Sequence, residues 1–290
     1  MQMKFFSIVV VSLNSGERLK QTLKSILDQT FTDYEVIIKD GGSKDGSLDF
    51  LIKEGILEKY PQICLIKQPD KSIYDGMNQA VSYVNGKYVQ FLNCGDLFYE
   101  EEVLQKTADY IMEQEEVTEP SIFYGNQYNL QQSSIVTSAP KINDFTCYRN
   151  VPCHQVCFYD KRLFQKRAYL PEYTVRGDYE HFLYCIYKQF VLHCIDYIEK
   201  NYTDDLSLEE ILEHSGVSRG NFCALFSELT GHTFNSYLNL CRIKKATEYI
   251  NRGYKITSIY GLCGYNDFST FFRNFKKVMG ISPKEYQKKK

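Results

Sequence analysis

The sequence lacks the features that would mark a membrane or secreted protein. None of its apolar runs is long enough to span a bilayer, so we expect no membrane span. The N-terminal apolar run is nine residues long and ends in Asn14-Ser15-Gly16 without a small-residue cleavage site. This indicates a buried first strand rather than a signal peptide. Together these absences favour a cytoplasmic protein.

The 10 cysteines show no pattern. None forms a C-x-x-C pair, and unpatterned thiols are typical of a reducing compartment. Cys153, His154 and Cys157 have the spacing of half a zinc site, but no second half with ligand spacing follows them. Because free cysteine is commonly a small buried hydrophobe, buried thiols are favoured over a zinc site.

Charge is distributed unevenly along the chain, although its formal net value is only −2. Residues 1–190 carry 20 Lys and Arg against 25 Asp and Glu, whereas residues 191–290 carry 14 against 11. The last part, from Arg242 to Lys290, holds 12 basic and 3 acidic residues. A basic C-terminus on an acidic body predicts a polyanionic partner for that end alone, with solvated surface lysines as the alternative.

Short β-branched runs alternate with amphipathic segments in the first 190 residues. This alternation predicts strands at 7–13, 34–39, 63–67 and 88–92 and helices at 17–29, 48–59 and 74–83. Such an order indicates an α/β domain with a mostly parallel sheet and helices on both faces. In these sheets, ligands bind beyond the carboxyl ends of the strands.

Acidic residues fall at those carboxyl ends. Asp40 follows the second strand and Asp96 follows the fourth. Asp70 and Asp75 follow the third. A single Asp after a strand is often a turn or N-cap residue. Several at one edge also suit a divalent cation that neutralises a diphosphate, so both interpretations stay open from residue type alone.

Six segments carry a resemblance to a known family. SIVVVSLN, KDGGSKDGS, QPDKSIYDGMNQA, GKYVQFLNCGD, CHQVCFYDKRLF and RGDYEHFL resemble the successive motifs of family-2 glycosyltransferases with the GT-A fold. The resemblance covers residues 5 to about 188, with the motifs in order and at familiar spacing. The PDKSIYDGMNQA segment is the most specific of them.

The resemblance implies a role for each matching residue. Asn14, Asp40 and Asp70 would line the pocket for the nucleotide of a UDP-type sugar donor. Asp96 ends the metal-binding motif and would bind the nucleotide sugar through Mn²⁺ or Mg²⁺ on its diphosphate. Asp178 matches the general base that deprotonates the acceptor hydroxyl, in a reaction that inverts the anomeric centre.

Two departures from the family pattern bear on activity. The motif Asn93-Cys94-Gly95-Asp96 has one carboxylate where many members have two. Family members also usually continue for several tens of residues past the Asp178 motif, with a further strand and a lid over the donor. A different kind of sequence replaces that region here.

The last 100 residues contain an internal repeat. A Phe-x-x-x-Phe pair and a following glycine recur 49 residues later, as Phe222, Phe226 and Gly231 and then Phe271, Phe275 and Gly280. A long helix over 234–251 is expected between the two units. Capping residues are expected at the helix starts, namely Ser207 with Glu210, Ser218, and Asp267. The pattern predicts an all-α domain with two helix-turn-helix units, for which packing without DNA is the alternative.

This repeat also resembles a family. LSLEEILEHSGVSRGNFCALF, YLNLCRIKKATEYI and ITSIYGLCGYNDFSTFFRNFKKVMGISPKEY closely resemble the AraC/XylS-type DNA-binding domain, which implies duplex DNA as a partner. The residues expected to face DNA are Arg219, Asn221, Asn266, Ser269, Thr270 and Arg273. Lys276, Lys277 and Arg242 are expected to contact phosphate or stay solvated. Because residues 191–241 sum to −6, the first unit is expected to add little DNA affinity.

The stretch Arg176–Tyr202 joins the two parts without a visible linker. It contains no proline and no glycine after Gly177, which predicts one nearly continuous helix of up to about 24 residues. The helix would carry Asp178 at its start and the opening helix of the DNA-binding domain at its end. We expect a glycosyltransferase family 2-like domain over 1–190 and an AraC-type domain over 191–290.

Three functions stay open. The favoured one is a transcription regulator with a sequence-specific DNA-binding C-terminus and a nucleotide-sugar-binding, glycosyltransferase-like N-terminus. The alternative is an active inverting glycosyltransferase of the hexosyltransferase type, whose DNA-binding tail is a relic of gene fusion. The third is a fusion in which neither half works fully. A homodimer is also left open.

Overall fold

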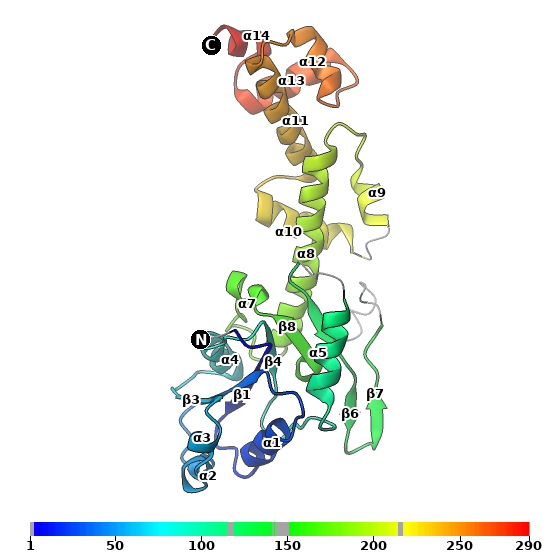
Figure 1. Cartoon of the computed structure of the whole chain (residues 1–290). Helices are drawn as coiled ribbons and strands as arrows, with labels where there is room; N and C mark the ends of the chain where they lie inside the picture. Colours follow the sequence, from blue (N-terminus) through cyan, green and yellow to red (C-terminus); the bar gives the residue numbers. More distant parts are fainter. Residues whose placement is uncertain (1–2, 115–118, 141, 143–150, 214–216, 290) are drawn as a thin grey trace. The chain divides into compact units, whose positions relative to one another are not determined.

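The structure is a computed structural model that describes residues 3–114, 119–140, 142, 151–213 and 217–289. The chain divides into two compact units (Figure 1). Among the described residues, the first unit ends at Leu183, and the second comprises Ile142 and the residues from Tyr184 onward.

A six-stranded sheet with the order β3-β2-β1-β4-β8-β5 organises the first unit. Strands β1 to β4 are parallel, β8 is antiparallel to β4, and β5 is antiparallel to β8. The expected α/β domain with a mostly parallel sheet is confirmed. The bounds are β1 Phe6–Ser12, β2 Tyr34–Asp40, β3 Ile63–Lys67, β4 Tyr88–Phe91, β5 Ile122–Tyr124 and β8 Cys157–Asp160.

Helices cover both faces of this sheet. On one face, α1, α2 and α5 pack their apolar residues against Ile8, Val10 and Val36 of the central strands. On the other face, Phe91 of β4 lies 5.5 Å from the ring of Phe164 in α7, measured between centroids. Burial on both sides explains why β1 is a continuous apolar run. The bounds are α1 Arg18–Leu27, α2 Asp49–Lys53, α4 Ile73–Val81, α5 Val103–Glu113 and α7 Arg162–Lys166.

The single helix expected over 48–59 is wrong, because the structure has two short helices there. Helix α2 ends at Lys53, and α3 spans Ile56–Lys59. Gly55 between them has a φ of +61°, a left-handed conformation that glycine adopts without steric cost. The apolar spacing continues across this turn, so periodicity alone cannot reveal it.

The remaining elements of the first unit lie between β5 and Gly177. Strands β6 and β7 form a separate two-stranded antiparallel sheet. A short 3₁₀ helix, η1, leads into β8 and contributes His154 to the site described below. The bounds are β6 Gln127–Asn129, β7 Ser134–Val136 and η1 His154–Val156.

The second unit is all-α, as expected. It has two apolar cores, one for each helix-turn-helix, and the long helix α11 contributes to both. The first core contains Phe222 and Phe226 of α10, and the second contains Phe271 and Phe275 of α13. The bounds are α9 Leu208–Glu213, α10 Arg219–Thr230, α11 Phe234–Asn251, α12 Ile256–Leu262, α13 Phe268–Met279 and α14 Pro283–Lys288.

The expected helix caps are confirmed. Ser207 and Glu210 exchange side-chain to backbone hydrogen bonds before α9. The Ser218 hydroxyl accepts from the backbone N–H of Asn221, and Asp267 Oδ1 accepts from that of Thr270 at 2.8 Å. Each cap satisfies a backbone donor at a helix start and contributes about 1 kcal/mol.

Helix α8 spans Gly177–Asn201 and has no break at 188–192, so the continuous helix is confirmed. Its first turn carries Asp178. Its last turns bury Val191, Cys194 and Ile198 in the first core of the second unit. One secondary-structure element therefore begins with Asp178 in its first turn and ends in the core of the second unit.

Candidate functional sites

Asp178 lies where the first turn of α8 approaches Tyr74 in α4. A Cβ added to Gly177 would come within 2.8 Å of the Tyr74 ring, so glycine is needed for this approach. The preceding residue, Arg176, has a φ of +64°, an uncommon conformation for a residue with a side chain. The result is a 2.7 Å hydrogen bond from the Tyr74 hydroxyl to Asp178 Oδ1.

The second carboxylate oxygen of Asp178 is held by His154. Its Oδ2 lies 2.7 Å from His154 Nδ1, and the Asp178 side chain is 23% exposed. Burial would raise the pKa of Asp178, but the hydrogen bond and charge of His154 and the hydrogen bond from Tyr74 outweigh it and lower the pKa to about 2. Burial and the bond to Asp178 raise the pKa of Tyr74 to about 12. Asp178 is therefore an ionised hydrogen-bond acceptor at neutral pH.

Residues 154 and 155 connect Asp178 to the segment that carries Asp96. His154 Nε2 lies 3.1 Å from Asn93 Nδ2, and Gln155 Nε2 donates to Asp96 Oδ2 at 3.1 Å. Asn93 and Asp96 are the two ends of the Asn-Cys-Gly-Asp motif. The structure thus brings the sequence-predicted base and the sequence-predicted metal carboxylate into one hydrogen-bonded network.

Asn14 lies in the loop that follows β1, and Asp40 is the last residue of β2. Both side chains bond the backbone of the loop after β2. Asn14 Oδ1 accepts from the backbone N–H of Lys44 at 2.9 Å. Asp40 is 2% exposed, and its Oδ2 accepts from the backbone N–H groups of Gly42 and Ser43 at 2.9 Å. Hydrogen bonds of this kind are typical of a turn residue, so Asp40 stabilises the turn after β2. Its role in ligand binding stays a prediction.

Asp70 forms a buried ion pair with Lys39. Lys39 Nζ lies 2.6 Å from Asp70 Oδ2 and donates to the carbonyl oxygen of Gln68 at the same distance. The two side chains are 0% and 8% exposed. Asp70 also fills the space beside Gly41, where an added Cβ would lie 2.7 Å from its Oδ2. The observed partner of Asp70 is Lys39, and a role for Asp70 in nucleotide binding stays a prediction.

The metal-binding motif implied by the resemblance contains one carboxylate, that of Asp96. Asp96 offers oxygen ligands of the kind that Mg²⁺ and Mn²⁺ bind. Among the described residues, no group of three or more His, Cys, Asp or Glu side chains could hold a metal ion. The residues present therefore fit a cation only if a diphosphate supplies most of its ligands.

The three residues of the zinc half-site considered from the sequence form hydrogen bonds with other protein groups in the structure. Cys153 bonds the Gln155 side chain, and Cys157 Sγ lies 3.3 Å from the carbonyl oxygen of Cys153. Both ring nitrogens of His154 lie at hydrogen-bonding distance from side chains. Cys157 is buried, and Cys153 is partly buried.

The sequence reasoning missed three residues of this network, namely Tyr74, His154 and Gln155. Each stands in a segment that carried the family resemblance, PDKSIYDGMNQA or CHQVCFYDKRLF. Tyr74 and Asp178 are 104 residues apart, so nothing local in the sequence pairs them. The family-like motifs were the available signal, and they mark the segments without indicating which side chains meet.

In the second unit, the predicted DNA-facing residues lie on the helices that follow each turn. Arg219 and Asn221 are exposed in the first turn of α10, but Arg219 forms an ion pair with Glu209. Asn266 lies just before α13 and is exposed. The structure therefore presents all of these side chains on surfaces rather than in a core.

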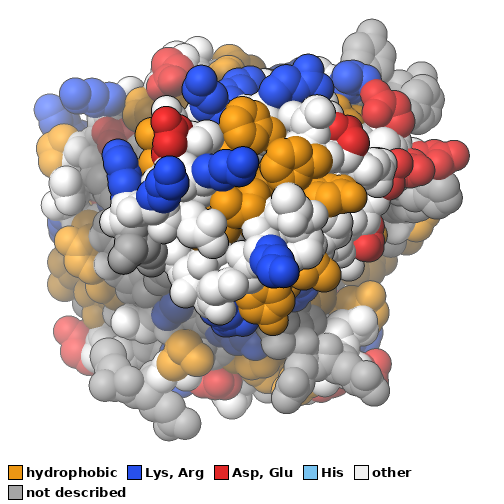
Figure 2. Space-filling model, turned by 90° about the horizontal axis from the view of Figure 1, so that it is seen from above, with side chains coloured by type: hydrophobic (Ala, Val, Ile, Leu, Met, Phe, Trp, Pro, Cys, Tyr) orange, Lys and Arg blue, Asp and Glu red, His pale blue; other side chains and the backbone are white. Residues whose placement is uncertain are grey.

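Helix α13 presents the more basic surface. Ser269, Arg273 and Lys276 are exposed at helical spacing, opposite Phe271 and Phe275. Thr270 is partly buried, and its hydroxyl accepts from Arg273 Nη2 at 3.2 Å. Lys and Arg side chains gather along part of the face seen in Figure 2, beside exposed hydrophobic side chains. This face suits a polyanion.

The expectation that Arg242 contacts phosphate or stays solvated is wrong. Its guanidinium donates to the carbonyl oxygens of Tyr202 and Asp204 at 2.7 and 2.8 Å. It also lies 5.4 Å from the centroid of the Tyr265 ring. Burial lowers the pKa of Arg242. Arg242 thus caps the chain after α8 and joins the two helix-turn-helix units.

Comparison with known proteins decides the family of the first unit. The model for "Glycosyl transferase family 2" matches residues 7–173, more than half of the chain. The chain belongs to glycosyl transferase family 2. The match ends before Asp178 and covers the sheet, the loops after its strands and the His154-Gln155 pair.

Relatives and solved structures agree with this family. A "PGL/p-HBAD biosynthesis glycosyltransferase" of Mycobacterium bovis is 31% identical over 184 residues, covering 62% of this chain and 69% of that protein. A crystal structure of S. aureus TarS 1-349 matches with a TM-score of 0.54 at 15% identity, covering 99% of this chain and 92% of that chain. At that identity the likeness shows the GT-A fold alone. Family 2 members commonly use divalent cations.

The second unit is an AraC-type helix-turn-helix domain. A "Helix-turn-helix domain" model matches residues 211–289. The "Transcriptional regulatory protein HptR" of Staphylococcus aureus is 28% identical over 99 residues, which cover 34% of this chain and 39% of that regulator. The glycosyltransferase family 2 and AraC-type parts expected from the sequence are both confirmed.

Membrane-spanning helices were also expected to be absent. Within the part of the chain that the structure describes, every helix is too short or too polar to cross a bilayer.

Proposed function

We propose that the first unit transfers a sugar from a UDP-type donor to an acceptor hydroxyl, with inversion at the anomeric carbon. The observation that carries this proposal is the network in which Tyr74 and His154 hold Asp178 and Gln155 reaches Asp96. A partly buried carboxylate whose pKa is shifted by specific partners is typical of a catalytic group. A structure of TarS has been solved with UDP-GlcNAc, which supports a UDP-type donor for a chain of this fold.

In the proposed step, the acceptor oxygen attacks the anomeric carbon on the face opposite the diphosphate. The new carbon–oxygen bond forms as the bond to the diphosphate oxygen breaks, and UDP leaves with that electron pair. The acceptor proton passes to the Asp178 carboxylate. A bound Mn²⁺ or Mg²⁺, held by Asp96, would neutralise charge on the leaving diphosphate.

The donor end of the site is formed by the loops after β1, β2 and β3. Asn14 and Asp40 hold those loops, and the Lys39–Asp70 pair fixes the third. We propose that these loops bind the nucleotide, with the backbone and side chains of this edge as its contacts. Rigid loops favour nucleotide binding because little ordering is needed when the ligand arrives.

A second function is favoured by the surface of α13. Arg273, Lys276 and Lys277 are exposed on the helix that follows the second turn. We propose that this helix enters the major groove of duplex DNA, as helices in this position do. The chain would then be a regulator whose DNA binding accompanies nucleotide-sugar binding, as its likeness to a transcriptional regulator suggests.

One experiment separates these functions. Calorimetry of the full chain with a panel of UDP-sugars and Mn²⁺ measures binding, and chromatography of released UDP measures turnover. Binding with transfer to an added acceptor supports the enzyme. Binding without turnover supports the regulator over the enzyme. Absence of binding to every UDP-sugar overturns the nucleotide-sugar proposal for both.

A further inference from the structure

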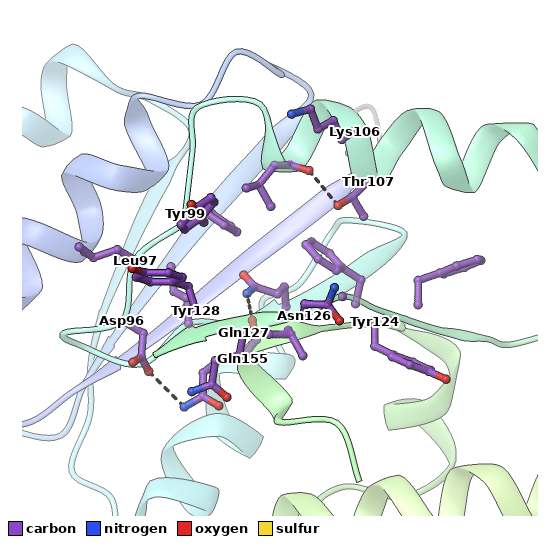
Figure 3. Close-up of a pocket in the computed structure, with 18 of the residues that line it drawn as sticks. Asp96, Leu97, Tyr99, Lys106, Thr107, Tyr124, Asn126, Gln127, Tyr128 and Gln155 are labelled. Carbon is purple, nitrogen blue, oxygen red and sulfur yellow. Dashed lines mark hydrogen bonds between the residues drawn. The ribbon is translucent and has the colours of Figure 1, made fainter. Parts of the chain in front are cut away.

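A pocket of about 630 Å³ lies beside Asp96 in the first unit. Its lining comes from β4, α5, β5, β6, η1 and β8, together with the segment between β4 and α5. Asp96 and Gln155, which belong to the network described above, both line it. Figure 3 shows these two side chains hydrogen-bonded to each other, with Tyr99 and Tyr128 nearby.

Tyrosine rings and exposed aliphatic groups dominate the wall of the pocket. The ring centroids of Tyr99 and Tyr128 lie 5.2 Å apart. The two residues are 68% and 36% exposed, respectively. Leu97 and Leu130, which also line the pocket, are 46% and 74% exposed. Large apolar side chains gathered on an open surface are typical of a binding site. Tyrosine rings in particular offer flat faces on which a ligand ring can pack.

One buried polar atom lines the pocket without a partner. Gln90 is 1% exposed, and its Nε2 donates to the carbonyl oxygen of Gln155 at 2.6 Å. Its Oε1 has no hydrogen-bond partner among the described residues. A buried amide oxygen without a donor is unfavourable, but less than 1 Å² of this atom is exposed, so the inference below does not depend on a ligand contact with it.

Charge in the pocket disfavours an anionic ligand. Lys106 is the only basic residue among the described residues that line it. Its Nζ lies 2.6 Å from Glu100 Oε1 and 3.1 Å from Glu102 Oε2. Asp96 adds a negatively charged carboxylate to the lining. Among the described residues, the lining therefore offers no unpaired basic side chain to balance a negative ligand.

We infer that this pocket binds the acceptor, and that the acceptor is an uncharged molecule with a hydroxyl-bearing ring that packs on Tyr99 and Tyr128. The inference rests on the proposed transfer reaction, because Asp96 is shared by the pocket and the proposed donor site. The apolar rim at Leu97 and Leu130 favours an acceptor that carries an aromatic or aliphatic group next to its sugar or phenol ring.

Three small probes test this on the full chain by saturation-transfer-difference NMR. Phenyl β-D-glucopyranoside is neutral and has an aromatic ring, phenyl β-D-glucuronide adds a carboxylate, and methyl β-D-glucopyranoside lacks the aromatic ring. We expect the phenyl glucoside to bind about three- to tenfold more tightly than either of the others. Equal binding of the glucuronide, or of the methyl glucoside, would overturn the assignment.

Tyr99→Ala and Tyr128→Ala locate the binding, and both side chains are exposed enough for the variants to fold. Each should weaken phenyl glucoside binding about three- to tenfold. Tyr83→Ala, at a tyrosine that is 47% exposed and does not line the pocket, is the matched control and should leave binding unchanged. Unchanged binding in both pocket variants would show that the probe binds elsewhere, against the proposal.

Competition separates this inference from the proposed function. UDP-GlcNAc with diamagnetic Mg²⁺ should bind the same sample without displacing the phenyl glucoside. Displacement would identify the pocket as the donor-sugar site and overturn the acceptor assignment. A chain that binds the nucleotide but gives no signal for the glucoside overturns the pocket proposal alone. A chain that binds neither overturns the proposed function as well.

Discussion

His154 Nδ1 lies 2.7 Å from Asp178 Oδ2, which joins the segment before β8 to the first turn of α8. With the Tyr74 hydroxyl on Oδ1, both carboxylate oxygens already accept a hydrogen bond. The carboxylate is therefore held in place and kept ionised, with a pKa of about 2. An acceptor hydroxyl that donates to Asp178 must share an oxygen with one of these two donors.

Removing this carboxylate tests its role. Asp178→Asn keeps the shape of the side chain but cannot accept a proton. Turnover should fall about 10²–10⁴-fold, the range that general bases supply, while UDP-sugar affinity stays within about twofold. Steady-state kinetics and calorimetry measure the two quantities. Asp109→Asn, at an exposed position on α5, is the control. Residual turnover within about tenfold of the parent would rule out Asp178 as the base.

Asp96→Asn tests the metal assignment, because asparagine can still accept the hydrogen bond from Gln155. Without the carboxylate charge, Mn²⁺ should bind poorly to the enzyme–nucleotide complex. We expect UDP-sugar affinity in the presence of Mn²⁺ to fall about tenfold or more, to the level of the parent chain in EDTA. Calorimetry with and without Mn²⁺ measures this. A variant whose affinity still depends on Mn²⁺ would place the cation elsewhere.

His181 predicts an acid-sensitive fold for the first unit. Its ring is fully buried, stacks on Phe164 at 4.5 Å and has Nε2 3.0 Å from the carbonyl oxygen of Arg167. Burial, with a smaller contribution from the charge of Arg167, lowers its pKa from 6.5 to about 4. The unfolded chain therefore binds this proton between about pH 6.5 and 4, while the folded chain does not.

The sign of the effect follows from that difference. Stability rises with pH where the unfolded state binds more protons, so the contribution of His181 is present above pH 6.5 and lost as pH falls towards 4. The loss should be roughly 3 kcal/mol. Urea unfolding of the first unit at several pH values measures it. His181→Gln should remove most of the slope in this window, and an unchanged slope would assign it to other groups.

DNA binding should depend on α13 and on salt. The three exposed cations Arg273, Lys276 and Lys277 predict a slope of log K against log salt of about −3. Arg273→Ala should weaken binding about 5- to 100-fold if it contacts a base. Arg219→Ala should change it by less than about threefold, because Glu209 already pairs with Arg219.

Fluorescence anisotropy of the full chain with a duplex selected from a random pool measures these effects. Lys245→Ala, at a partly buried position on α11 that pairs with Glu248, is a charge-matched control and should have a small effect. Binding that does not change with salt would argue against phosphate contacts. A larger loss for Arg219→Ala than for Arg273→Ala would reverse the assignment of the two units.

Local signals in the sequence predicted most of the fold. Apolar periodicity marks β1 and α11, and capping residues such as Ser218 and Asp267 act within four residues of themselves. The break between α2 and α3 at Gly55 was not predicted, because apolar spacing does not indicate a left-handed backbone conformation. Local sequence patterns therefore predict the helices and strands, but they do not predict every turn between them.

The site was predicted less completely, for a physical reason. Asp96 and Asp178 could be named from motifs, but their connection through His154 and Gln155 depends on how β8 and η1 are placed by the fold. Arg242 was misassigned because its partners are backbone carbonyls 38 and 40 residues earlier in the chain. Contacts to backbone atoms leave no trace in residue type, so the sequence could not indicate them.

Helix α8 also determines how the two halves can be studied apart. His181 belongs to the packing of the first unit, while Val191 and Ile198 belong to that of the second. A cut placed between them opens a hydrogen-bonded helix, and a fragment that starts at residue 191 exposes a core residue at a fraying end. A fragment that starts at Tyr184 keeps a full turn ahead of Val191. Limited proteolysis should accordingly find no cleavage site within α8 that releases two intact halves.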